Sequence, residues 1–264
     1  YTDFVDRTPK LPPHALFFRV SVYRHHKTEQ EIVMPYFVED FGKVVRPHVS
    51  KPQKAVVGFC GLSRYKSQAR ALKAHAKWGA FKLALILKGD ALPGVHAPAV
   101  WWRRRAIQAL TSSSAVETKI IERASYSLHR GSVSGDPEKI RADYRENMEA
   151  STLALSVRGD ANASQRLYEA LSCGRVPLFL DTDSVLPLEE VAPYEKCIIR
   201  VPCSGIHALP DRAAAWHAEH TNVSFLEAES AAQALFRKYL RLDRYFEIVF
   251  DRDSSPYKKV LYGK

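Results

Sequence analysis

The sequence has 264 residues, 46% of them hydrophobic and 26% charged, the mixture of an ordinary globular protein. This length allows one large domain or two small ones, with a core that needs no metal or disulfide. The formal charge of +10 and the pI near 9.4 favour polyanionic partners such as nucleic acid, anionic polysaccharide, a membrane surface or phosphate groups. The basic residues are dispersed, with one tight cluster at Arg103-Arg104-Arg105, so a dedicated nucleic-acid-binding arm is disfavoured.

Cysteine usage and hydropathy leave the cellular location open. The four cysteines lack CxxC spacing and are expected to be buried small hydrophobes, although Cys197 and Cys203 are close enough in sequence to pair in an oxidising compartment. No apolar run reaches the roughly 20 residues of a membrane span, and no signal peptide is found. Because the chain starts at Tyr1, this says little about an anchor. A Golgi lumen and a bacterial or viral cytoplasm both fit.

The first fifty residues have a pattern of their own. An apolar run at 15–20 predicts a strand, and a polar turn follows at 23–27. A second short apolar run at 31–34 ends before Pro35. The basic stretch bracketed by Pro47 and Pro52 is typical of a linker without regular structure.

From Lys54 onward the pattern alternates between strand and helix, which predicts an α/β fold with a mainly parallel sheet. Short continuous apolar runs are typical of strands buried on both faces. Asp136-Pro137 is a helix start, with an N-cap followed by a proline in the first turn. The predicted elements are strands at 55–60 and 81–87 and helices at 67–78, 101–110 and 137–150.

The clearest unit is a strand, loop, helix and strand between residues 152 and 180. The strands at 152–157 and 176–180 flank a helix at 164–173, which Gly174 closes as its C′ residue. This arrangement is a βαβ unit and requires parallel pairing. Beyond it, the tail from 224 to 249 is predicted to be helical.

The loop 158–163 lies at the carboxyl end of a predicted strand, where open parallel sheets bind their ligands. It leads into a helix N-terminus, which suits a phosphate. Arg158 and Arg166 would add bidentate contacts to an oxyanion. Ser164 would cap the helix or donate to the phosphate, and Glu169 would accept ribose hydroxyls. The bland alternatives are a cap only for Ser164 and an ion pair of Arg166 with Glu169 or Glu149.

Several linked motifs resemble the signature of the exostosin family of glycosyltransferases. A helix led by Tyr144 precedes a strand ending in Arg158-Gly159, a Ser-x-Arg-x-x-Glu-Ala helix from Ser164 and a Val-Pro strand at 176–180. Neither GxGxxG nor a P-loop is present, so a dinucleotide fold and a P-loop kinase gain no support. Further similar segments are Leu186-Pro-Leu-Glu-Glu-Val191, Gly58-Phe-Cys-Gly-Leu-Ser-Arg-Tyr65 with Arg70, and Glu31-Ile-Val-Met-Pro35, so that the likeness runs from about 31 to 250.

The resemblance implies a GT-B fold, in which two Rossmann-like domains face a cleft and the C-terminal one holds the donor. It also implies inversion at the anomeric carbon and no essential bound metal or other cofactor. Carried over to this chain, Arg64 and Arg158 would contact the diphosphate. Glu189 or Glu190 would touch the donor sugar, and the alternative for both is a solvated loop acid. The nucleotide and sugar would be lined by Gly159, Ser164, Arg166 and Glu169.

A domain division follows from these expectations. Residues 1–53 would be the remnant of an acceptor-side domain with its linker, 54–250 the nucleotide-sugar-binding domain, and 251–264 a tail. An inverting transferase needs a general base for the acceptor hydroxyl. His25 and His26 are the candidates on the acceptor side. Weaker ones are His129 and Asp136, in the loop before helix 137–150.

The predicted function is an inverting hexosyl- or pentosyltransferase of polysaccharide biosynthesis. It would move a sugar from a nucleoside diphosphate, with UDP favoured, to a glycan hydroxyl. The alternative is an inactive nucleotide- or glycan-binding scaffold subunit, and a homo- or hetero-oligomer fits either. Nucleic-acid binding rests on the charge alone. Three features are explained without a function. Trp101-Trp102 is expected to pack, Arg103–Arg105 to form a solvated helix face, and the glycosylation triplets at Asn162 and Asn222 to occur by chance.

Overall fold

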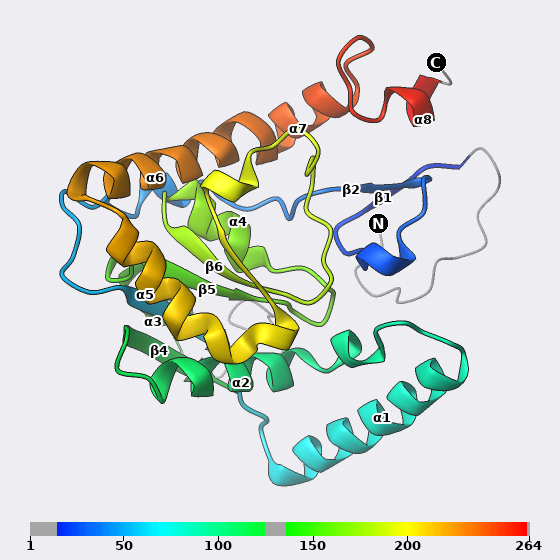
Figure 1. Ribbon diagram of the computed structural model, residues 1–264, viewed down its shortest axis with the longest axis horizontal. Coiled ribbons are helices and arrows are strands. Elements are labelled where there is room, and N and C mark those ends of the chain that lie inside the picture. The colour runs from blue at the N-terminus through cyan, green and yellow to red at the C-terminus, as the bar shows by residue number, and fades with distance from the viewer. Residues whose placement is uncertain (1–14, 125–135, 263–264) are drawn as a thin grey trace.

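A five-stranded parallel sheet forms the centre of the protein (Figure 1). The computed structural model describes residues 15–124 and 136–262. The strand order is β4-β3-β5-β6-β7, which confirms the expected α/β class with a Rossmann-type sheet in GT-B style. The strands are β3 (Val56–Leu62), β4 (Glu117–Arg123), β5 (Leu153–Val157), β6 (Val176–Asp181) and β7 (Ile199–Pro202).

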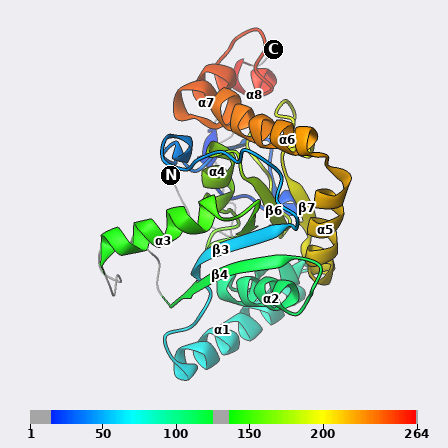
Figure 2. The same ribbon diagram turned by 90° about the vertical axis from the view of Figure 1, so that its left-hand side faces the viewer.

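Helices cover both faces of this sheet (Figure 2). One face packs against α2 and α5 through Trp102, Leu110 and Leu209. The other packs against α3, α4 and α6, and Met148, Ala154 and Ala170 lie in this layer. None of the helices in the described ranges combines the length and apolar character needed to cross a membrane. The helices are α1 (Gln68–Leu87), α2 (Ala99–Thr111), α3 (Pro137–Glu149), α4 (Gln165–Ser172), α5 (Leu209–Glu219), α6 (Asn222–Leu235), α7 (Leu242–Val249) and α8 (Lys258–Tyr262).

The order in which the chain visits the strands creates a topological switch point. The first strand, β3, is flanked by β4 on one side and by β5 on the other. The chain therefore reverses its direction of travel across the sheet between these two neighbours. Ligands of open parallel sheets bind beyond the carboxyl ends of the strands at such a point. In this protein those ends are Leu62 and Val157.

The expected strand at 81–87 is wrong, because these residues form the second half of α1. The only candidate breaker between the predicted helix and the predicted strand is Gly79, and one glycine costs a helix only about 1 kcal/mol. The Ala, Leu and Lys residues that follow favour helix. The helix packs on α2 through Trp78 and Trp101, whose ring centroids are 5.7 Å apart, and extends away from the body of the molecule (Figure 1).

Four helices and strands of the described ranges had no counterpart in the sequence-based prediction: β4, β7, α5 and α8. β4 is an edge strand, and the charged residues Glu117, Lys119 and Glu122 interrupt its apolar pattern. β7 is the other edge strand and has only four residues. The helical tail is confirmed, but a π-helical turn at Phe236–Leu240 lies between α6 and α7.

The N-terminal segment packs directly on the large domain. β1 (Phe17–Arg19) and β2 (Glu31–Val33) form a separate parallel pair beside α7 (Figure 1). Ile32 is fully buried in the same core as α4 and α6, and the Tyr245 hydroxyl donates to the Val33 carbonyl at 2.9 Å. The stretch 47–52 lacks regular structure, as expected, but His48 lies 2.7 Å from the Glu229 carboxylate. A domain boundary at residue 53 stays a prediction.

The cysteines behave as buried apolar residues. Cys197 and Cys203 do not pair, because the whole length of β7 lies between them and separates them by far more than a disulfide spans. Burial raises the pKa of Cys173 to about 12 and that of Cys197 to about 11. Both groups therefore stay protonated thiols at neutral pH.

Two glycines provide a matched test of the fold. Gly174 has a φ of +76°, and a Cβ there would lie 2.9 Å from the Glu229 carbonyl oxygen. We expect Gly174→Ala to lower the free energy of unfolding by about 1–3 kcal/mol. Gly79 lies inside α1 with open space around it, so Gly79→Ala should raise that free energy by about 0.5–1 kcal/mol. Urea denaturation measures both, and shifts of the same sign would contradict the assignment.

Candidate active site

Arg103 joins the two strand ends at the switch point. It lies on α2, and its Nη1 donates to the Leu62 carbonyl at 2.9 Å while its Nε donates to the Arg158 carbonyl at 3.1 Å. The expected solvated face is therefore wrong for Arg103. Consecutive helix residues point about 100° apart, so the three arginines cannot share one face. Arg104 and Arg105 are exposed, as expected.

The two tryptophans before this cluster pack rather than line a ligand site. Trp102 is buried in the core under the sheet and donates to the Val95 carbonyl at 3.4 Å. Trp101 contacts Trp78 and carries the Arg105 guanidinium at 4.8 Å from its ring centroid. Helix packing therefore accounts for both rings.

Arg158 is a buried guanidinium at the end of β5, with 4% of its surface exposed. It donates four hydrogen bonds, to the Tyr23 hydroxyl and to three main-chain carbonyls. One of these carbonyls belongs to Val95 and another to Asp160. The side chain thus ties the N-terminal segment and the loop before α2 to the loop after β5. A role of Arg158 in diphosphate binding stays a prediction, and its loss would also disturb these loops.

Arg166 and Glu169 lie three residues apart on α4 and both contact Tyr144. Arg166 donates to the Cys60 carbonyl of β3, and its guanidinium lies over the rings of Phe59 and Tyr144 at 4.5 and 5.1 Å from their centroids. Glu169 is buried and accepts hydrogen bonds from Tyr144 and Gln165. Burial, together with the Glu169 charge, raises the pKa of Tyr144 well above its usual value. The phenol therefore remains a donor to this carboxylate.

The amino end of α4 faces the switch point and keeps polar groups available. Ser164 is its N-cap residue, but its side chain makes no capping hydrogen bond. The Gly159 amide donates to the Ala163 carbonyl at 2.8 Å and so closes the loop between β5 and α4. The helix N-terminus and the Ser164 hydroxyl thus remain suited to an anion.

Arg64 is the exposed cation of this edge. Its side chain is 65% exposed beyond the end of β3 and forms an ion pair with Glu122 of β4 at 2.7 Å. Burial alone would raise the pKa of Glu122, but the hydrogen bonds from Arg64 and Ser63 hold it below its usual value. The charge of Arg104 also acts on this carboxylate. Arg64 and Arg104 therefore form a positive rim at β3 and β4.

The two glutamates expected near the donor sugar lie in different surroundings. Glu189 accepts from Arg24 at 2.8 Å and lies 2.7 Å from Nη2 of Arg200. Glu190 is half-exposed, and its carboxylate is 4.0 Å from Nζ of Lys27. Contact of either with a donor sugar stays a prediction.

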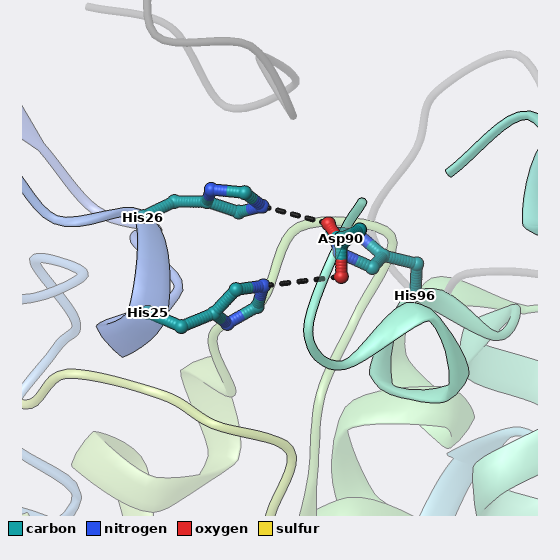
Figure 3. A group of neighbouring side chains, drawn as sticks. All are labelled: His25, His26, Asp90 and His96. Atoms are coloured by element: carbon teal, nitrogen blue, oxygen red, sulfur yellow. Dashed lines mark hydrogen bonds and ion pairs between the residues drawn. The ribbon is translucent and has the colours of Figure 1, made fainter. Parts of the chain in front are cut away.

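His25 and His26, the expected general bases, belong to a cluster that the sequence did not indicate. The histidine cluster consists of His25, His26, Asp90 and His96 (Figure 3). Asp90 follows α1, and His96 lies in the next turn, so these two approach from the side opposite the N-terminal segment. Asp90 Oδ2 lies 2.8 Å from His26 Nε2 and 3.6 Å from His96 Nε2. Its Oδ1 lies 3.4 Å from His25 Nε2.

Asp183 supports this cluster from the end of β6. Its carboxylate accepts from both the main-chain amide and Nδ1 of His25. Its φ of +64° is unusual for a residue other than glycine. Asn162 fixes this loop by donating to the Thr182 carbonyl at 3.1 Å and is itself 2% exposed, which rules out a glycan there. Burial would raise the pKa of Asp90, but His26, the Leu92 amide and the other histidines hold it below its usual value.

The remaining base candidates are Asp136 and His129. Asp136 is the N-cap of α3 and accepts from the Glu138 amide, as expected for a helix start. His129 lies outside the described residues.

Comparison with known proteins supplies the family. The Exostosin GT47 domain matches residues 31–214, about 70% of the chain. The chain belongs to the exostosin GT47 family. This membership makes it a glycosyltransferase-family protein. A search of curated proteins finds no match.

The exostosin match covers only part of the residues described above. It includes all of the sheet and the edge around Arg64, Arg158 and α4. It begins after the first two histidines of the cluster, so the family assignment does not cover His25 and His26.

The bridging role of Arg103 can be tested against its neighbour. Arg103→Ala leaves two strand-end carbonyls without their donors, so we expect the free energy of unfolding to fall by about 1–3 kcal/mol. Arg104→Ala removes an equal charge from an exposed position and should change it by no more than about 0.5 kcal/mol. Chemical denaturation compares the two. Equal effects would show that Arg103 does not hold the strand ends.

Proposed function

We propose that this exostosin-family protein transfers a sugar from a nucleoside diphosphate sugar, with UDP favoured, to a glycan hydroxyl with inversion. The observation that carries the proposal is the positively charged edge of the sheet at the carboxyl ends of β3 and β5, named the positive edge below. There the exposed Arg64 and the N-terminus of α4, whose N-cap Ser164 makes no capping hydrogen bond, lie beyond the neighbouring strands β3 and β5. An anionic diphosphate is the ligand that such an edge favours.

The exposure of each side chain at this edge indicates the role it would have in binding the donor. Arg64 can turn toward a ligand, because Ser63 also donates to its Glu122 partner. Arg158 and Arg166 are engaged with carbonyl groups and aromatic rings. They would act on the diphosphate through their fixed positive charge, with little reorganisation. Ser164 would donate to a phosphate oxygen.

The edge reaches solvent at Arg64, whose side chain is 65% exposed. A donor bound here would therefore be covered from the sheet side and reachable by an acceptor from the other. In-line displacement requires this access, because the acceptor hydroxyl must approach opposite the departing diphosphate.

Donor binding is tested with a matched pair of exposed arginines. Arg64 and Arg244 each pair with one glutamate, at 2.7 and 2.6 Å, and their side chains are 65% and 56% exposed. We expect Arg64→Ala to weaken UDP affinity by roughly 10- to 100-fold, because it removes a charged hydrogen bond to phosphate. Arg244→Ala should leave affinity unchanged. Calorimetric titration with UDP measures both.

If UDP and GDP both fail to bind the unaltered chain, the proposed donor site is wrong. If both variants bind UDP as the unaltered chain does, the nucleotide binds elsewhere.

Turnover separates a transferase from a nucleotide-binding scaffold. We expect release of UDP to depend on an added glycan primer and to fall by about 10²–10³-fold in Arg64→Ala, since the arginine stabilises charge on the leaving group. The measurement is coupled detection of UDP, with NMR of the product to establish inversion. Nucleotide binding without primer-dependent release would favour the scaffold alternative.

A further inference from the structure

The histidine cluster is a second site, distinct from the positive edge. Its residues come from three short segments: the 3-10 helix Arg24–His26, the residue Asp90 after α1, and the 3-10 helix Pro93–His96. One donor atom from each side chain lies within 4.8 Å of the others. Two of the four residues precede the exostosin match, so family membership does not explain why they meet.

The spacing of the donor atoms fits a small cation. Ligands bound tetrahedrally to zinc at about 2.0–2.1 Å are about 3.3 Å from one another. From Asp90 Oδ2, the Nε2 atoms of His26 and His96 lie at 2.8 and 3.6 Å, on either side of this value. The Nε2 atom of His25 lies 3.4 Å from the other oxygen, Oδ1. The four donor atoms lie within 4.8 Å of one another, so the side chains would close by at most about 1.5 Å to form a coordination shell.

The surroundings supply the support that metal-bound histidines need. The second ring nitrogen of a ligating histidine donates its N–H to a carboxylate or carbonyl, and this hydrogen bond fixes the orientation of the ring. His25 has this arrangement, with Nδ1 on Asp183 and Nε2 directed toward Asp90. This Nε2 atom is buried and makes no hydrogen bond to a described residue. A ring nitrogen held in this way is prepared to bind an ion.

The charges at the site also balance for a divalent ion. Asp90 and Asp183 bring two negative charges to the cluster, with side chains only 3% and 15% exposed. The three imidazoles bind a metal in their neutral form. A divalent cation would therefore compensate both carboxylates at once.

We propose that the histidine cluster binds one Zn²⁺ ion. Three imidazole nitrogens and one carboxylate oxygen suit zinc, whereas Mg²⁺ and Ca²⁺ prefer oxygen ligands only. Four protein ligands fill a tetrahedral shell, so the ion has a structural role. This departs from the expectation of a metal-free protein. It also replaces the general-base role of His25 and His26, because a ligated nitrogen has no lone pair to accept a proton.

Zinc binding would also affect the positive edge, because the cluster adjoins the residues that hold Arg158. Tyr23 precedes the first two histidines, and its ring lies 4.2 Å from that of His96. The Tyr23 hydroxyl and the Val95 carbonyl both accept from Nη1 of Arg158. Zinc binding would fix the two segments that hold this guanidinium. The ion would clamp the N-terminal segment onto the donor side of the protein.

The test is zinc titration of the full chain after removal of metal with EDTA. Calorimetry should give one Zn²⁺ per chain, and the thermal unfolding midpoint should rise with it. His26→Asn should weaken binding by more than 100-fold. This side chain is 43% exposed, so its replacement leaves the fold intact. Asp183→Asn should weaken binding by about 10- to 100-fold, and asparagine tolerates the positive φ. His207→Asn, an exposed control, should bind as the unaltered chain does.

Cobalt separates this site from binding by cysteine. Co²⁺ in the cluster should give visible d–d bands of a four-coordinate site without thiolate charge-transfer absorption. The proposal is overturned if the stripped chain binds no zinc, if His26→Asn binds it equally well, or if the spectrum shows thiolate ligation. None of these measurements uses a nucleotide, so their outcome is independent of the proposed transferase activity.

Discussion

The buried guanidinium of Arg158 is the constraint on which the arrangement of this protein depends. A charge removed from water is tolerated only if its hydrogen-bonding groups find partners. Here the partners come from the N-terminal segment, the turn before α2 and the loop after β5. The loop that leads into α4 therefore cannot take its position without the other two. The hydrogen bond that Arg158 donates to the hydroxyl of a sequence-distant residue, Tyr23, becomes a condition for the geometry of the loop before α4.

The same requirement explains why the first part of the chain is attached to the sheet. Ile32 is buried beside α7, Tyr23 meets Arg158, and His25 meets Asp183 at the end of β6. Apolar burial supplies most of the stabilisation, and the polar contacts determine where the N-terminal segment lies on the sheet. The unusual φ of Asp183 is one result, since the turn must present its carboxylate to both the amide and the ring of His25. Strain of this kind persists where surrounding contacts determine the backbone.

The sequence predicted the parts of the fold whose signals are local. The βαβ unit with Gly174 at the helix end, the start of α3 at Asp136 and the strand β3 all follow from short patterns, and the structure has them. The second half of α1 was missed because its apolar run was assigned to a strand, although no residue had ended the helix. The edge strand β4 was missed because charged residues interrupt its apolar pattern. The histidine cluster was beyond reach, because about 65 residues separate His25 from Asp90 and no spacing rule connects them.

The arginines of this edge fall into two groups, those bound to main-chain carbonyls and those exposed to solvent. The sequence motif alone does not distinguish the two groups. Arg103, Arg158 and Arg166 donate to main-chain carbonyls of β3, of the loop after β5 and of the turn before α2, and so connect these elements. Such residues form a fixed field that an anion meets without reorganisation. Arg64 and Arg104 stand in solvent and can move to meet a ligand. A diphosphate bound at this edge would therefore be selected by mobile charges and held by immobile ones. This separation suits a leaving group whose charge grows during the reaction.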